Sequence, residues 1–390
     1  MSPPTSAFEP ERFSIRVEDG TLQDLRERLV KTRWPQAAPG AAWDQGTDLD
    51  YLKALVDHWL RQFDWRAQER WLNSFDNHRV RIEGTSIHFV HQRARNGHGI
   101  PLIISHGWPS SFVEMLPLVA LLTDPQANGI DGPSFDVVIP SLPGYGLSER
   151  PARAVRYRDV GRMWHVLMRG LGYSRYGAGG SDFGSGVSTF MALDEPEAMI
   201  GLHLTNLELA PYVGAGSRPL SAAERGYLEQ SSRWGQTEAG YTAIQSTRPQ
   251  TLGYALNDSP AGLAAWILEK WRSWSDCDGD LDACFSREFL LTMVTLYWVT
   301  ETITPSMRDY VDNRRWQGEP RLGPGDLVRV PTGVAVFPNM FVPEGEVPRE
   351  WAQRLYDVRR WTRMERGGHF AAAEEPALVA QDICAFFAGL

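Results

Sequence analysis

The sequence has few cysteines, and only Cys277, Cys284 and Cys384 occur among its 390 residues. Their number is odd, and their spacing matches neither a zinc site nor a disulfide framework. Cys277 and Cys284 are placed where a pair is possible, but we favour reduced thiols in a cytosolic protein. The sequence therefore predicts a cytoplasmic protein with no metal site and no cofactor.

Long apolar segments and basic runs are also missing. No stretch approaches 18 continuous apolar residues, and the N-terminus lacks the apolar core of a signal peptide. The formal net charge is −9, with no long run of lysine or arginine. These absences argue against a transmembrane helix, and they make nucleic acid and anionic membranes poor partners.

The order of the sequence patterns predicts the fold. The first segment is helical, with Thr21 as the N-cap of an amphipathic stretch. Short apolar strands then alternate with helical segments, a helical block follows, and strands resume near the C-terminus. This order predicts an α/β protein with a doubly wound, mostly parallel sheet, a helical lid and an N-terminal helical and meander extension. The predicted units are an extension (1–78), a first core segment (79–211), a lid (212–325) and a second core segment (326–390).

The stretch "GGSDFG" at 179–184 has the form of a strand-to-helix turn that exposes a nucleophile. Such a turn needs small residues two positions before and after the nucleophile, because its strained backbone is crowded. Around Ser181 those positions are Gly179 and Phe183, whereas around Asp182 both are glycine. The spacing therefore selects Asp182, although an aspartate here can also simply cap the following helix.

Two further motifs fit an active site around Asp182. "SHGWPSS" ends a predicted strand, so the backbone N–H of Trp108 can pair with that of Phe183 as an oxyanion hole. "GGHFAAAEEP" follows the last predicted strand and places His369 after the nucleophile in chain order. A lone histidine is more often structural, but its position behind this turn favours a catalytic role.

Together with "PGYG", "GYTAIQSTRPQTLGYALNDSPAGLAAWILEKW" and "FPNMF", these motifs resemble the epoxide hydrolases of the α/β-hydrolase fold. The resemblance is to the microsomal type with an N-terminal domain, and it runs from about residue 12 to the C-terminus. Lacking the membrane anchor of the microsomal enzymes, the chain is more similar to soluble bacterial members. That group includes enzymes of enediyne antibiotic biosynthesis, a branch of secondary metabolism.

The resemblance implies a role for each matching residue. Asp182 corresponds to the nucleophile and His369 to the base that activates water, while Tyr241 and Tyr310 correspond to two lid tyrosines that hold the epoxide oxygen. Chemistry supports this assignment, since a phenol stabilises the poor alkoxide leaving group and a carboxylate opens the ring to an ester that water can cleave. A serine nucleophile would leave an unreactive ether.

One position departs from the family pattern. The acid that orients the histidine usually stands two residues after "FP", where this chain has Met340, and a thioether cannot do that work. We expect Glu344 or Glu346, in the longer following segment, to replace it. Glu208 and then Glu301 are the next alternatives, and a histidine without any orienting acid is the last.

The leading prediction is therefore an epoxide hydrolase that forms a vicinal diol. A haloalkane dehalogenase also uses an aspartate nucleophile, but paired lid tyrosines suit an epoxide oxygen better than a halide. A non-catalytic ligand-binding homologue is the third alternative, and the methionine at position 340 is its main support. The 15 tryptophans suggest a bulky or aromatic epoxide, and a homodimer is also expected.

Overall fold

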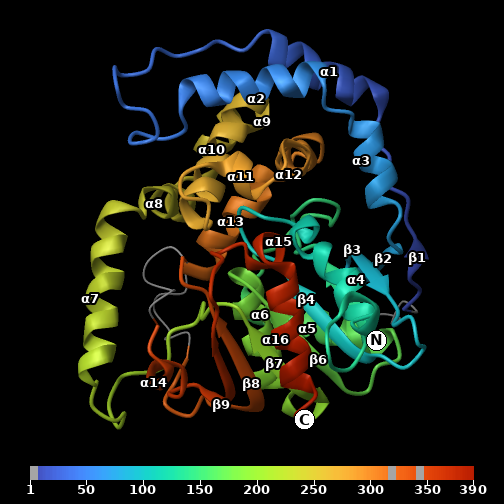
Figure 1. Cartoon of the computed structure of the whole chain (residues 1–390), viewed down its shortest axis with the longest axis vertical. Helices are drawn as coiled ribbons and strands as arrows, with labels where there is room; N and C mark the ends of the chain where they lie inside the picture. The colour runs from blue at the N-terminus through green and yellow to red at the C-terminus, as the bar shows by residue number, and fades with distance from the viewer. Residues whose placement is uncertain (1–7, 315–321, 340–346) are drawn as a thin grey trace.

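The computed structural model describes residues 8–314, 322–339 and 347–390, in which a nine-stranded sheet carries the rest of the molecule (Figure 1). The strand order is β1-β2-β3-β5-β4-β6-β7-β8-β9. The pairs from β1 to β5 are antiparallel and the pairs from β5 to β9 are parallel, so the predicted mostly parallel α/β sheet is confirmed. The strands are β1 (Glu11–Arg12), β2 (Asn77–Ile82), β3 (Thr85–Gln92), β4 (Ile100–Ser105), β5 (Phe135–Pro140), β6 (Tyr176–Gly180), β7 (Met199–Leu204), β8 (Val328–Val336) and β9 (Tyr356–Arg363).

Helices cover both faces of the sheet, because the parallel strands are apolar on both sides. All six residues of β5 are buried, as are all five of β6. Helices α4 and α16 pack together on one face, and α5 packs against α6 on the other (Figure 1). The core helices are α4 (Pro117–Thr123), α5 (Tyr157–Gly170), α6 (Phe183–Asp194), α14 (Arg349–Ala352), α15 (Ala371–Glu374) and α16 (Pro376–Phe387), with the 3-10 turns η1 (Phe112–Met115), η2 (Gln126–Asn128) and η3 (Pro196–Ala198).

A helical lid lies over the carboxyl ends of the central strands, as the sequence predicted (Figure 1). The turn that contains Tyr145 and Gly146 fastens it, because Tyr145 Oη donates to the carbonyl of Ser306 (3.3 Å) and the Gly146 N–H donates to Thr302 Oγ1 (3.3 Å). The lid helices are α7 (Ala222–Thr237), α8 (Gly240–Thr247), α9 (Pro249–Asp258), α10 (Pro260–Trp274), α11 (Leu281–Cys284), α12 (Arg287–Val299) and α13 (Ile303–Arg314).

The N-terminal extension wraps over the lid and then joins the sheet. Helices α1 (Asp19–Val30) and α2 (Leu49–Arg61) cross the lid helices, and α3 (Trp65–Leu72) leads down to β2 (Figure 1). The predicted N-cap at Thr21 is wrong: α1 begins at Asp19 with Glu18 as its N-cap, so Thr21 lies inside the first turn. The boundary predicted after residue 78 falls within β2, a strand that pairs with β1 of the extension on one side and with β3 on the other.

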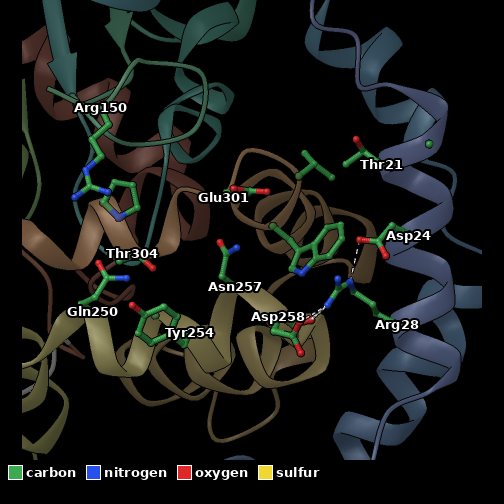
Figure 2. A pocket seen from close by; sticks show the side chains of 15 residues that line it. Thr21, Asp24, Arg28, Arg150, Gln250, Tyr254, Asn257, Asp258, Glu301 and Thr304 are labelled. Atoms are coloured by element: carbon green, nitrogen blue, oxygen red, sulfur yellow. Dashed lines mark hydrogen bonds and ion pairs between the residues drawn. The ribbon is translucent and has the colours of Figure 1, made fainter. Parts of the chain in front are cut away.

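Arg28 of α1 ties the extension to the lid (Figure 2). Its Nε donates to Asp24 Oδ2 at 2.9 Å, and its Nη1 donates to the carboxylate of Asp258 at the end of α9 and to the Asp258 carbonyl at 2.9 Å. These contacts border a cavity of about 640 Å³ between extension and lid, on whose wall Glu301 lies.

Candidate active site

Asp182 occupies a strained turn between β6 and α6. Its backbone has φ +51° and ψ −128°, a conformation that few non-glycine residues adopt. A Cβ at position 180 would lie 2.6 Å from the carbonyl oxygen of Ser105, and one at position 184 would lie 2.1 Å from the same atom. Glycine is therefore required at both positions, which is the steric reason for which the sequence spacing selected Asp182.

The Asp182 carboxylate has a different neighbour at each oxygen. The Trp108 N–H donates to Oδ1 at 2.9 Å, and Nε2 of His369 lies 3.5 Å from Oδ2. Glycine at position 107 permits this approach, because a Cβ there would lie 2.2 Å from Oδ1. Phe183 begins α6, so its N–H is one of the helix-end donors without an intrahelical acceptor. The structure thus brings the predicted nucleophile, histidine and oxyanion-hole residues together.

Ser181 faces away from this group. Its residue is 5% exposed and lines a small apolar cavity beneath the sheet end, together with Gly179 and Thr205. Within residues 8–314, 322–339 and 347–390, the Ser181 hydroxyl makes no hydrogen bond. Asp182, and not Ser181, is therefore the side chain that meets His369.

The loop that carries His369 is held by the lid and by a buried carboxylate. The His369 N–H donates to the carbonyl of Trp274 at the end of α10 (2.8 Å). Glu374 accepts the N–H groups of Asp276 (2.7 Å), Gly368 (2.9 Å) and Phe370 (2.9 Å). Burial nevertheless raises the pKa of Glu374 to about 7. These bonds fix the histidine loop on both sides of the imidazole.

Two lid tyrosines enclose the site with the aromatic ring of Trp108. Tyr241 of α8 stacks on Trp108, with centroids 5.5 Å apart and an interplanar angle of 6°. Tyr310 of α13 meets the Trp108 ring edge-on at 5.6 Å and lies 5.0 Å from the ring of Phe183. Burial raises the pKa of Tyr310 well above its usual range, so this side chain is a neutral phenol and a hydrogen-bond donor at neutral pH.

The four proposed orienting acids have different positions. Glu344 and Glu346, like Met340, lie outside the described residues, so their role stays a prediction. Glu208 accepts a hydrogen bond from Tyr157 Oη (3.0 Å), and its charge contributes to the raised pKa of Tyr310. Glu301 is exposed on the wall of the cavity beneath α1, whose lining includes none of Asp182, His369, Tyr241 and Tyr310.

Sequence reasoning missed three residues that build the site. Asn206, after β7, accepts the N–H of Asp182 at its Oδ1 (2.6 Å) and so braces the strained turn. Glu374 was part of a quoted motif, but one of its three backbone contacts is to Asp276 of the lid, which lies 98 positions away in the sequence. Glu114, in the turn after "HGWPSS", is 1% exposed, and burial raises its pKa to about 7.

Glu114→Gln should change the pH dependence of stability. The folded-state pKa of Glu114 is about 7 against an ordinary 4.5, so between these pH values the folded protein keeps a proton that the unfolded chain releases. The free energy of unfolding therefore falls as pH rises through this window, by on the order of 3 kcal/mol for this group. Urea unfolding from pH 4.5 to 8 measures this dependence. Glu114→Gln should reduce the loss of unfolding free energy with rising pH, whereas Glu197→Gln, at an exposed position, should leave that loss unchanged. Equal slopes in both variants and the wild type would contradict this.

The described residues include no group of three or more His, Cys, Asp or Glu arranged to hold a metal ion. Within the same ranges, no helix is both long and apolar enough to cross a membrane. Cys277, Cys284 and Cys384 are free thiols, as the sequence favoured, and the alternative Cys277–Cys284 pair is not formed.

Comparisons with known proteins agree with this geometry. Residues 10–115 match the family described as epoxide hydrolase N terminus, and residues 100–250 match the alpha/beta hydrolase fold. A candidate epoxide hydrolase of Stigmatella aurantiaca is 39% identical over 95% of this chain and 83% of its own. Epoxide hydrolase 1 of Sus scrofa is 37% identical over 96% of this chain and 87% of its own. The structure of Aspergillus niger epoxide hydrolase superposes with a TM-score of 0.83 at 30% identity, covering 98% of this chain and 97% of that one.

Proposed function

The chain belongs to the epoxide hydrolases of the α/β-hydrolase fold, and from that premise we propose that it opens an epoxide to a vicinal diol through an ester on Asp182. The observation that carries the proposal is the placement of Asp182. Its carboxylate lies between the Trp108 N–H and the His369 imidazole, beneath the rings of Tyr241 and Tyr310.

The two carboxylate oxygens take different parts in ring opening. Oδ1 is bound by the Trp108 N–H, so it becomes the carbonyl oxygen of the ester, and Oδ2 attacks an epoxide carbon. The carbon–oxygen bond of the epoxide breaks, and the leaving oxygen takes the proton of a lid phenol, Tyr241 or Tyr310, which becomes a tyrosinate until ester hydrolysis. The phenols are needed because charge develops on a poor leaving group in a site screened from water.

Ester hydrolysis uses the other half of the site. His369 takes a proton from a water molecule, whose oxygen adds to the Asp182 carbonyl carbon. The Trp108 and Phe183 N–H groups stabilise the resulting oxyanion. The carbon–oxygen bond of the ester breaks on the Asp182 side, so Oδ2 leaves with the substrate and becomes a hydroxyl of the diol by taking the proton from His369. The second proton of the water restores the tyrosine phenol. The carboxylate thus regains one oxygen from water.

The aromatic lining of the site indicates the substrate class. The same turnover experiment distinguishes the rival functions. The rings of Trp108, Tyr241, Tyr310 and Phe183 favour a bulky or aromatic epoxide. Styrene oxide is a suitable probe, with phenylethane-1,2-diol as the expected product. Release of halide from a haloalkane would instead support a dehalogenase, and binding of styrene oxide without turnover would support a non-catalytic homologue. A cytoplasmic location, a homodimer and a role in enediyne biosynthesis stay predictions.

Tyr241→Phe and Tyr310→Phe should each slow ring opening. Removing one donor that stabilises a developing oxyanion costs roughly 2.7–4 kcal/mol, or about 10²–10³-fold in rate. Rapid-quench mass spectrometry of the Asp182 ester measures this step directly. The double variant should form almost no ester, and wild-type rates in both single variants would mean that other groups hold the epoxide oxygen.

A further inference from the structure

Lys270 is a buried cation beside the aromatic site. The residue lies on α10 and is 8% exposed, which is unusual for lysine. Its Nζ lies 4.8 Å from the ring centroid of Tyr241 and 6.0 Å from that of Trp274. None of the steps assigned above to Asp182, His369 and the tyrosines uses this charge.

Lys270 has an acidic neighbour towards an outer cavity and aromatic neighbours towards the active site. Its Nζ pairs with the carboxylate of Glu269, whose side chain is 24% exposed and lines an outer cavity beneath residues 35–49. The Lys270 side chain is 11% exposed and lies against the aromatic rings. The Glu269 carboxylate offsets part of the Lys270 charge, and the ammonium is the charged group that lies over the Tyr241 ring, 4.8 Å from its centroid.

A cation over an aromatic face stabilises that ring, and it stabilises the ring more when the ring carries negative charge. The Tyr241 phenol gains negative character when it donates its proton to the epoxide oxygen. Only an interaction that is stronger in the transition state than in the ground state raises the rate of the chemical step. A fixed ammonium 4.8 Å from this ring satisfies that condition.

We infer that Lys270 is a positioning residue for ring opening, which stabilises through the face of the Tyr241 ring the charge that develops on that phenol. This inference rests on the proposed function and assigns the two lid tyrosines unequal parts. Tyr310 has an edge-on neighbour in Trp108, whereas Tyr241 has Trp108 stacked in parallel at 5.5 Å and the ammonium at 4.8 Å. Tyr241 is then the stronger proton donor, and Tyr310 is the hydrogen-bonding partner.

The experiment compares Lys270→Met and Lys270→Arg in single turnovers of styrene oxide, followed by mass spectrometry of the Asp182 ester. Lys270→Met should slow ester formation about 30-fold and leave the rate of ester hydrolysis unchanged. Lys270→Arg should recover most of the rate, because a guanidinium keeps the charge and stacks on aromatic faces. Lys53→Met, which removes a half-exposed lysine on α2, is the matched control and should behave as the wild type.

A second background separates charge from packing. In Tyr241→Phe, adding Lys270→Met should cause little further loss, because the phenol through which Lys270 acts is gone. The same 30-fold loss in that background would overturn the inference, as would a wild-type rate of ester formation in Lys270→Met. A wild-type protein that forms no ester from styrene oxide would overturn the proposed function as well, so the two failures are distinguishable.

Discussion

Asp182→Asn should abolish diol formation from styrene oxide, with a loss on the order of 10⁶-fold in kcat, as for other enzymes that lose their nucleophile. The amide is nearly isosteric, so the φ +51° turn and the Asn206 contact to the backbone N–H are kept. What disappears is the negative charge of Oδ2, and with it the attack on the epoxide carbon. The loss therefore reports on chemistry and not on folding, which an unchanged Tm would verify.

Oxygen labelling identifies the ester directly. In a single turnover in ¹⁸O-water, label should enter the Asp182 carboxylate, and the first diol should contain none, because the water oxygen stays on the carbonyl carbon. Ser181→Ala is the matched control, since its side chain faces the apolar cavity and turnover should be retained. Label that appears directly in the first diol would instead mean that water opens the ring without a covalent intermediate.

The turn that holds Asp182 could be predicted from the sequence because its requirement is local. Two glycines at fixed spacing are needed where the Ser105 carbonyl crowds the backbone, and both lie within the six residues 179–184. The alternation of strands and helices predicted the sheet for a similar reason, since each buried strand is a short apolar run.

Residues whose role depends on tertiary contacts could not be predicted. Asn206 acts on an N–H that lies 24 positions earlier, and Lys270 faces a ring from another helix. The N-cap of α1 was misplaced because both Thr21 and the preceding acidic residues suit a helix start, and only packing decides between them. A glutamate that orients a histidine is equally non-local, so spacing alone left four alternatives.

His369→Gln should stop the reaction after ring opening. Ester formation requires Asp182 and the lid tyrosines, whereas ester hydrolysis requires a base for water, and glutamine cannot accept that proton. The ester should form in a normal burst and then persist, with hydrolysis slowed on the order of 10⁴-fold or more. Intact-mass measurement after rapid quench would find the protein heavier by one styrene oxide. His98→Gln changes an exposed histidine and is the control that should turn over normally.

The same trapped ester identifies the acid that orients His369. If Glu344 or Glu346 does this, its change to glutamine should leave the burst intact and slow hydrolysis by up to about 10⁴-fold, because the imidazole loses the charge that fixes its tautomer. Glu208→Gln tests the next alternative: it removes a carboxylate that accepts from Tyr157, and it should trap the same ester only if Glu208 is the acid that orients His369. Glu301→Gln, on the cavity wall beneath α1, should affect neither step. If none of the four variants accumulates ester, His369 works without a carboxylate partner, and Met340 marks a true loss of that group.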